Sequence, residues 1–324
     1  MTVRLASVRL PYARVLLPRT RLAYVHLRNL LTDAKRDRAA RVSGYVVVWL
    51  PDELVTLYLQ HGEVVNATTY DGKAFTVVPI GTAIGKVPPE PEYGEICFHE
   101  AEDEQLCCMF TAQTASPDGW PPELRVGDPN VLFPYLMSTT FDGMVEIRSD
   151  GGLNYLVFAD GNLERSYLAP SEGATLLEQI SHLFAGQPRV EVSVRRWQKV
   201  TPLRVQASPA LIQAYRELLS GLVQRATSAG SSSALAIAEH ARQSLLTRHP
   251  SLDGFAFSDR PVSEPVADGT ELTAAVAAWI QEFMWTAADH DRSSPEEMLR
   301  DAVWERRHIF QSAGLFDRIP WKVA

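Results

Sequence analysis

An internal repeat constrains the fold of this 324-residue chain more than any other feature of its sequence. Residues 44–67 and 143–166 share one spacing of glycine and apolar positions, at an offset of 99 and without a gap. The offset pairs Gly44 with Gly143 and Gly62 with Gly161. A repeat of this length indicates two copies of one small structural unit.

Each copy is expected to form a meander of three antiparallel strands, because β-branched and aromatic residues lie between short groups of turn-forming residues. An apolar spacing typical of a helix precedes each copy, and a segment led by Gly72 or Gly173 follows it. Residues 176–184 then predict an amphipathic helix in the second copy. Residues 75–84 are β-branched and contain a proline, which disfavours a helix in the first.

Each copy is expected to close with a further strand pattern. In the second copy this pattern covers residues 189–197, and in the first copy residues 94–111 predict a β-hairpin that turns near Glu102 and Asp103. The predicted class is α+β, with two tandem antiparallel-meander units followed by an all-α, four-helix domain. The expected parts are a basic N-terminal arm (1–19), unit one (20–115), a linker (116–129), unit two (130–202) and the helical domain (203–324).

The last third of the chain changes to helical patterns. Ser208 before Pro209 predicts the N-cap of the first of four helices, and residues 294–297 read as a capping box for the last one. Four tryptophans are expected in the core of this domain. The alternative hypothesis is that they line a groove that binds a partner. They are Trp279, Trp285, Trp304 and Trp321.

The composition favours a folded cytoplasmic protein. No apolar run approaches the about 20 residues of a membrane span, and the arginine-bearing first 21 residues lack the apolar stretch of a secretory signal. The three cysteines cannot form a disulfide framework and suit a reducing compartment.

The formal net charge of −8 is unevenly distributed. The first 43 residues hold ten Lys and Arg against two acidic side chains, whereas residues 90–104 are strongly acidic. Few aromatic residues accompany the basic ones, so a nucleic-acid site is disfavoured and a contact with a protein partner or within the molecule is expected. The candidate contact residues are Glu95, Glu100, Glu102, Asp103, Glu104, Arg36, Arg38 and Arg41.

Cys97, His99 and Cys107 are weak candidates for a metal site. Pairing of their segments in a hairpin would place Cys97 and His99 on one side, but the spacing is not that of a zinc site, and buried free thiols are the favoured interpretation. A nucleophile elbow and a phosphate-binding loop are both missing from the sequence. We therefore expect no metal, no cofactor and no catalytic residue.

The order of elements resembles the PATAN-type domain of bacterial regulatory proteins. The resemblance is carried by residues 41–46, 57–67 and 72–74 in the first copy and by residues 141–145, 156–163 and 173–174 in the second. The resemblance implies protein–protein interaction without catalysis, in signalling or surface motility. This chain departs from the usual arrangement because it lacks a receiver pattern and carries two copies with a helical domain.

The leading hypothesis is a non-catalytic regulatory or scaffold protein that binds another protein or itself. One alternative is a sensor that holds a small ligand or a nucleotide between the two units, near Gly62 and Gly161. A second alternative is an enzyme or metal-binding protein that uses Cys97, His99 and Cys107.

Overall fold

A computed structural model describes residues 5–36, 42–88, 92–170, 175–184, 192–230, 232–257, 264–288 and 294–322. The chain forms two compact units. The first comprises Met1–Val78 with Ala83–Leu203, and the second comprises Pro79–Thr82 with Arg204–Ala324. Within the described ranges, no helix is both long enough and apolar enough to cross a membrane.

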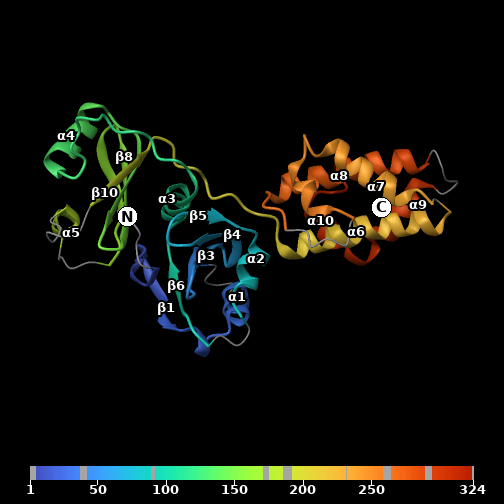
Figure 1. The fold of residues 1–324 in the computed structure, drawn as a ribbon, viewed down its shortest axis with the longest axis horizontal. Coiled ribbons are helices and arrows are strands. Elements are labelled where there is room, and N and C mark those ends of the chain that lie inside the picture. Colours follow the sequence, from blue (N-terminus) through green and yellow to red (C-terminus); the bar gives the residue numbers. More distant parts are fainter. Residues whose placement is uncertain are drawn as a thin grey trace. The chain divides into compact units, whose positions relative to one another are not determined.

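Two antiparallel sheets form the first unit, which confirms the α+β class (Figure 1). In sheet order, the six strands of the first are β1 (Arg14–Arg21), β6 (Glu95–Glu100), β2 (Gly44–Trp49), β3 (Leu54–Gln60), β4 (Glu63–Tyr70) and β5 (Phe75–Val77). The four strands of the second are β10 (Ser193–Trp197), β7 (Gly143–Ser149), β8 (Gly152–Ala159) and β9 (Asn162–Tyr167).

The two meanders predicted from the repeat have the same hydrogen-bonding register. Gly44 lies opposite Leu59 in the first sheet, and Gly143 lies opposite Phe158 in the second. Both second-to-third strand ladders contain a β-bulge at the corresponding position, before Leu59 and before Phe158. The closing strand then pairs with the first meander strand in each copy, β6 with β2 and β10 with β7. The sequence repeat is therefore a repeat of structure.

Helices cover the sheets. The first unit holds α1 (Leu27–Arg36), α3 (Asp103–Thr114), α4 (Pro129–Ser138) and α5 (Leu176–Phe184), and α2 (Ile80–Gly85) spans the boundary between the units. Helices α4 and α5 pack on one face of the second sheet. The other face of that sheet shares a core with α3 and with the first sheet, so α3 lies between the two sheets (Figure 1).

The predicted hairpin over residues 94–111 is wrong. Residues 95–100 form β6 as a single strand, and residues 103–114 form helix α3. Asp103 and Glu104 suit the first turn of a helix, where negative charge is stabilising. Eight residues of α3 are buried, so the helix is enclosed on most sides and lacks the one-sided apolar pattern that marks a surface helix.

The turn between the last two meander strands requires glycine in both copies. Gly62 and Gly161 have φ values of 80° and 76°, which belong to the left-handed region. The end of the preceding helix lies against each turn, because a Cβ would meet Ala34 O at 2.4 Å in the first copy and Leu136 O at 2.7 Å in the second. Each turn glycine thus lets a helix pack directly on backbone.

Alanine at Gly44 or Gly143 is expected to destabilise the first unit by about 1–3 kcal/mol. A Cβ would lie 2.1 Å from His99 O at the first position and 2.2 Å from Trp197 O at the second, and neither backbone atom can move without breaking the ladder. Urea unfolding followed by circular dichroism measures the loss. Gly85→Ala is the control, since nothing lies within 4 Å of its Cβ; equal stabilities of all three variants would contradict the close packing.

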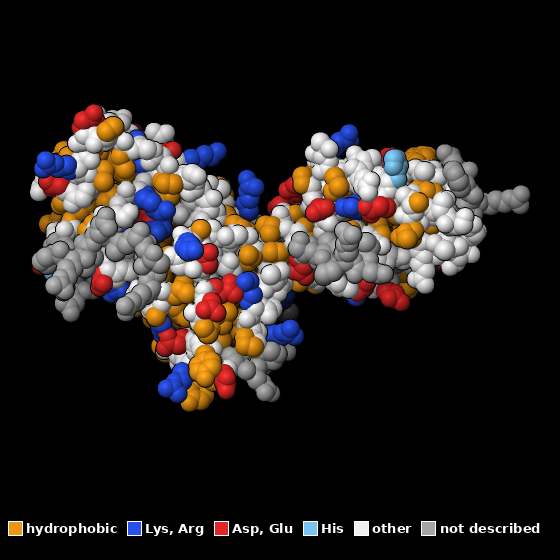
Figure 2. Space-filling view, in the orientation of Figure 1, with side chains coloured by type: hydrophobic (Ala, Val, Ile, Leu, Met, Phe, Trp, Pro, Cys, Tyr) orange, Lys and Arg blue, Asp and Glu red, His pale blue; other side chains and the backbone are white. Residues whose placement is uncertain are grey.

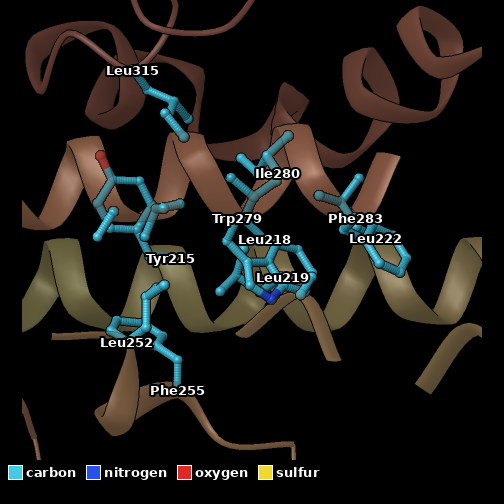
Figure 3. Close-up of a cluster of buried hydrophobic side chains, with 14 of the residues drawn as sticks. Tyr215, Leu218, Leu219, Leu222, Leu252, Phe255, Trp279, Ile280, Phe283 and Leu315 are labelled. Atoms are coloured by element: carbon cyan, nitrogen blue, oxygen red, sulfur yellow. The ribbon is translucent and has the colours of Figure 1, made fainter. Parts of the chain in front are cut away.

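The second unit is helical. Its helices are α6 (Pro209–Ser228), α7 (Ala234–Leu245), α8 (Gly269–Ala288), α9 (Pro295–Val303) and α10 (Arg307–Ser312). Figure 3 shows the core between them, where Tyr215 and Leu219 of α6 and Trp279 and Phe283 of α8 are buried. The Ser208 hydroxyl accepts a hydrogen bond from Leu211 N, which confirms the predicted N-cap of α6.

Three expectations about this unit are wrong. The segment expected as the fourth helix is divided into α9 and α10 by a 3-10 turn at Trp304–Arg306. Ser294 caps α9 without a side-chain hydrogen bond, so the capping box does not form. Trp279 is fully buried, but Trp285 and Trp304 are 62% and 70% exposed. Trp285 follows Trp279 by six residues and so lies on another side of α8, and Trp304 belongs to the 3-10 turn, where no residue is buried. Trp321 packs against the core from its edge.

Candidate functional site

The candidate site lies on the face of the first sheet that shares a core with α3. Alternation along a strand places Tyr45, Val47 and Trp49 of β2 on this face. The antiparallel register sets His99 opposite Tyr45 and Cys97 opposite Val47. Two residues predicted as a cluster therefore lie together, with Cys97 Sγ 3.9 Å from His99 Nδ1.

The N-terminal segment, residues 8–12, lies beside this face. Its Pro11 carbonyl accepts hydrogen bonds from the Tyr45 hydroxyl at 2.8 Å and from Gln105 Nε2 of α3. The same Tyr45 hydroxyl lies 3.0 Å from His99 Nδ1. The Tyr12 ring packs on the His99 ring, with 4.3 Å between their centroids. These contacts fix both the segment and the imidazole.

A cavity of about 110 Å³ opens between these residues. Its walls come from β2, from β6, from the N-terminal segment, from Arg19 of β1 and from Pro170. The Arg19 guanidinium stacks on the Trp49 ring at 4.2 Å and donates to Glu95 Oε2 at 2.6 Å. The walls are mainly aromatic and aliphatic, and the charge of Arg19 is neutralised by Glu95.

Both titratable groups of the cluster are uncharged at neutral pH. Burial raises the pKa of the Cys97 thiol to about 12 and lowers the pKa of His99 to about 4. A cysteine nucleophile needs its thiolate, which a nearby imidazolium or a helix N-terminus ordinarily stabilises. The surroundings of Cys97 do the opposite, so this arrangement does not activate the thiol.

The third member of the predicted cluster lies apart from the other two. Cys107 is half-buried on α3, where burial raises the pKa of its thiol. The hairpin that was to bring it beside Cys97 does not exist. No group of three or more His, Cys, Asp and Glu side chains with metal-binding geometry occurs among the residues that the structure describes.

The stability of the first unit is expected to fall as the pH drops from about 6.5 to about 4. His99 has a pKa near 4 when folded and an ordinary value of about 6.5 when unfolded. The unfolded chain therefore binds the proton first as the pH falls, and the stabilisation present above pH 6.5 is lost through this window. The pH series of unfolding free energies should be flatter for His99→Gln. Equal slopes for the two proteins would contradict a half-buried, neutral imidazole.

Four of the five acidic candidate residues pair with arginines of the first unit. Besides the Glu95 pair, Glu100 binds Arg14 at 2.7 Å across the β1–β6 ladder. Arg165 of β9 pairs with two of them: its Nη1 lies 3.1 Å from Glu102 Oε2, and its Nε lies 3.2 Å from Glu104 Oε2. Asp103 lies in the first turn of α3. Much of the acidic run is thus engaged inside the molecule, partly by arginines of the basic head.

The remaining predicted residues fall at turns or outside the described part of the chain. Backbone of the preceding helices lies against Gly62 and Gly161. Gly72 has a φ of 88° in a turn where the Asp71 carboxylate accepts from two backbone N–H groups. Arg38, Arg41 and Gly173 lie outside the described residues, as does the Arg36 side chain.

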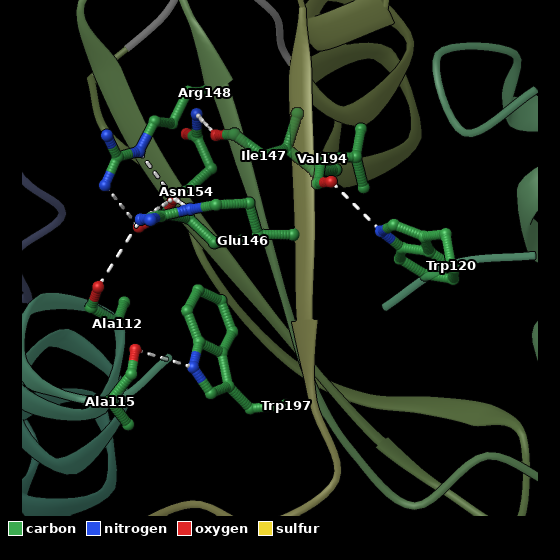
Figure 4. A network of polar contacts seen from close by, with 10 residues as sticks. Ala112, Ala115, Trp120, Glu146, Ile147, Arg148, Asn154, Val194 and Trp197 are labelled. Carbon is green, nitrogen blue, oxygen red and sulfur yellow. Dashed lines mark hydrogen bonds and ion pairs between the residues drawn. The ribbon is translucent and has the colours of Figure 1, made fainter. Parts of the chain in front are cut away.

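A buried charged network on the second sheet was not predicted. Glu146 of β7 is fully buried and accepts from Arg148 Nε at 2.5 Å and from Arg195 Nη2 of β10 at 2.7 Å (Figure 4). Arg195 also reaches the Ala112 carbonyl of α3 at 3.4 Å. The signal in the sequence was a glutamate between Val145 and Ile147, in the middle of an apolar strand.

Comparisons of the chain with protein-family models, with curated proteins and with solved structures find no match. The function is therefore inferred from the residues of this chain.

Proposed function

We propose that the chain is a non-catalytic cytoplasmic regulatory or scaffold protein that binds another protein through its helical unit. The observation that carries this proposal is the exposure of two indole side chains, 62% for Trp285 and 70% for Trp304. Tryptophan is enriched among the residues that dominate protein–protein binding energy, because its large apolar surface gains most from burial by a partner.

Other exposed apolar features of the unit support a protein partner. The Trp285 ring lies 5.7 Å from the Trp321 ring, so two indoles form one aromatic pair. A separate groove of about 430 Å³ runs beside α6, lined in part by Val223, Leu235 and Phe255. On the face drawn in Figure 2, hydrophobic side chains of the helical unit lie between charged ones, as at the contact surfaces of proteins that also exist unbound.

The proposal extends to a relationship with PATAN-type domains. Its support is the order of elements that both copies share, a helix, a three-stranded meander and a closing strand. The neutral state of the buried Cys97 and the half-buried His99 favours a non-catalytic role over the enzyme alternative.

Affinity purification from the source cells with the full chain tests the proposal. We expect a protein that is retained by the wild-type chain and lost by the double variant Trp285→Ser/Trp304→Ser. The control is Tyr24→Ser/Tyr93→Ser, which removes two exposed aromatic residues from the first unit instead, 78% and 70% exposed. Retention of the same protein by the tryptophan variant, or loss of it in the tyrosine variant alone, would overturn the assignment to the helical unit.

A further inference from the structure

The cavity of the first copy has a filled counterpart in the second copy. The register places Glu146 opposite Arg195, as Val47 lies opposite Cys97. At the repeat offset of 99, Glu146 is the equivalent of Val47, and Arg148 is the equivalent of Trp49. In the second copy these positions carry three charged side chains that bind one another. The first copy has neutral residues there and a hollow above them.

The walls of the hollow are held in place without a ligand. Arg9 N donates to Gly151 O at 2.9 Å, and Leu153 N donates to Arg9 O at 2.9 Å, so the N-terminal segment is tied to the second sheet. Tyr45 and Gln105 hold the same segment from the first sheet and from α3. A pocket with such fixed walls binds without the entropic cost of ordering them.

Two polar groups in the walls lack a partner among the described residues. Trp49 is 8% exposed, and its buried Nε1 has no hydrogen-bond acceptor. His99 contacts Tyr45 and Cys97 through Nδ1, and no described residue hydrogen-bonds to its Nε2. The Trp49 Nε1 atom has almost no accessible surface and does not face the hollow. His99 Nε2 is therefore the group left for a molecule in the hollow, which can bring it a donor or an acceptor.

We propose that this cavity binds a compact, uncharged, single-ring aromatic compound that carries one hydroxyl group. The volume limits the ligand to a single ring, because an enclosed apolar cavity of about 150 Å³ is known to admit benzene, whereas this one has about 110 Å³ and is open to solvent on one side. The rings of Tyr12, Tyr45 and Trp49 favour a flat molecule, and a hydroxyl can donate to or accept from His99 Nε2 according to the tautomer of the imidazole.

The charge state of the walls excludes an ionised ligand. The two guanidinium groups in the walls already have carboxylate partners, Glu95 for Arg19 and Asp150 for Arg9, and the other polar side chains are neutral near pH 7. A carboxylate in the cavity would have to displace one of these partners or remain unpaired in apolar surroundings. This site lies in the first unit and does not depend on the proposed contact of the helical unit with a protein.

Calorimetric titration of the full chain with phenol tests the proposal, with toluene and benzoate as comparison compounds. We expect one phenol per chain, weaker binding of toluene and none of benzoate. Val47→Met places a longer side chain in the cavity and should weaken phenol binding at least about tenfold. The matched control is Val157→Met, in the same core but outside the cavity walls, which should bind phenol like the wild-type chain.

His99→Phe keeps the ring and removes its polar atoms, and it provides a second test should Val47→Met fail to fold. The loss of one hydrogen bond should weaken phenol binding about tenfold and change toluene binding by less than about twofold. No phenol binding by the folded wild-type chain would overturn the proposal. So would unchanged binding by a folded Val47→Met, an unchanged preference for phenol over toluene in His99→Phe, or tighter binding of benzoate than of phenol.

Discussion

Replacing Glu146 by alanine should lower the unfolding free energy of the first unit by about 3 kcal/mol. The substitution leaves Arg148 and Arg195 without their shared carboxylate, and removal of one partner from a buried ion pair typically costs about 3–5 kcal/mol. The side chains of the two arginines are 22% and 26% exposed, so both can regain some water. We therefore expect a value near the lower end of that range, measured by denaturant unfolding.

Two variants separate the loss of charge from the loss of packing. Glu146→Gln keeps the shape and one acceptor oxygen, and should cost less than the alanine variant. The triple variant Glu146→Leu/Arg148→Met/Arg195→Met removes all three charges and should recover most of the lost stability, since well-packed apolar residues can replace a buried ion network. A cost below about 1 kcal/mol for Glu146→Ala would contradict the buried position of this carboxylate.

The meanders could be predicted because their signals are local. The turns at Gly62, Gly151 and Gly161 each pair a glycine with a preceding residue in left-handed backbone, and apolar strand residues alternate between the turns. The offset of 99 then doubled the evidence, because both copies had to adopt one register. The outer strands β1 and β5 lie beyond the repeat and had no comparable signal.

Helix α3 and the cavity depend on contacts between distant parts of the chain. Since α3 is buried between two sheets, its apolar residues do not follow one stripe, and its sequence resembled a strand. The cavity forms where the paired strands β2 and β6 meet the segment around Tyr12, which precedes β2 by more than 30 residues. The sequence placed Cys97 and His99 on one side of a strand, but it could not show that Tyr45 and Trp49 would join them.

The exposed tryptophans show the same limit in the helical unit. A helix of 20 residues such as α8 has apolar residues around much of its circumference, so position along the chain alone does not separate Trp279 from Trp285. The two tryptophans differ in whether neighbouring parts of the unit cover their rings. The core position can be recognised once Trp279 is seen to donate to the Ala238 carbonyl of α7 at 3.0 Å.

Trp279→Ala is expected to lower the unfolding free energy of the helical unit by about 3–5 kcal/mol, the usual cost of removing a buried tryptophan side chain. The ring is fully buried and stacks on Phe283 at 4.9 Å and on Phe257 at 5.3 Å. Its loss leaves a cavity between three neighbours and takes away the hydrogen bond to the Ala238 carbonyl. Denaturant unfolding followed by circular dichroism measures the change.

Trp285→Ala is the matched control, because it removes the same side chain six residues further along the same helix. With 62% of Trp285 exposed, we expect a change within about 0.5 kcal/mol. Similar costs for the two variants would contradict the assignment of Trp279 to the core and of Trp285 to a binding surface. Paired with Glu146→Ala, the experiment also tests the division into two units: each substitution should move a different unfolding transition, since Glu146 and Trp279 belong to separate cores.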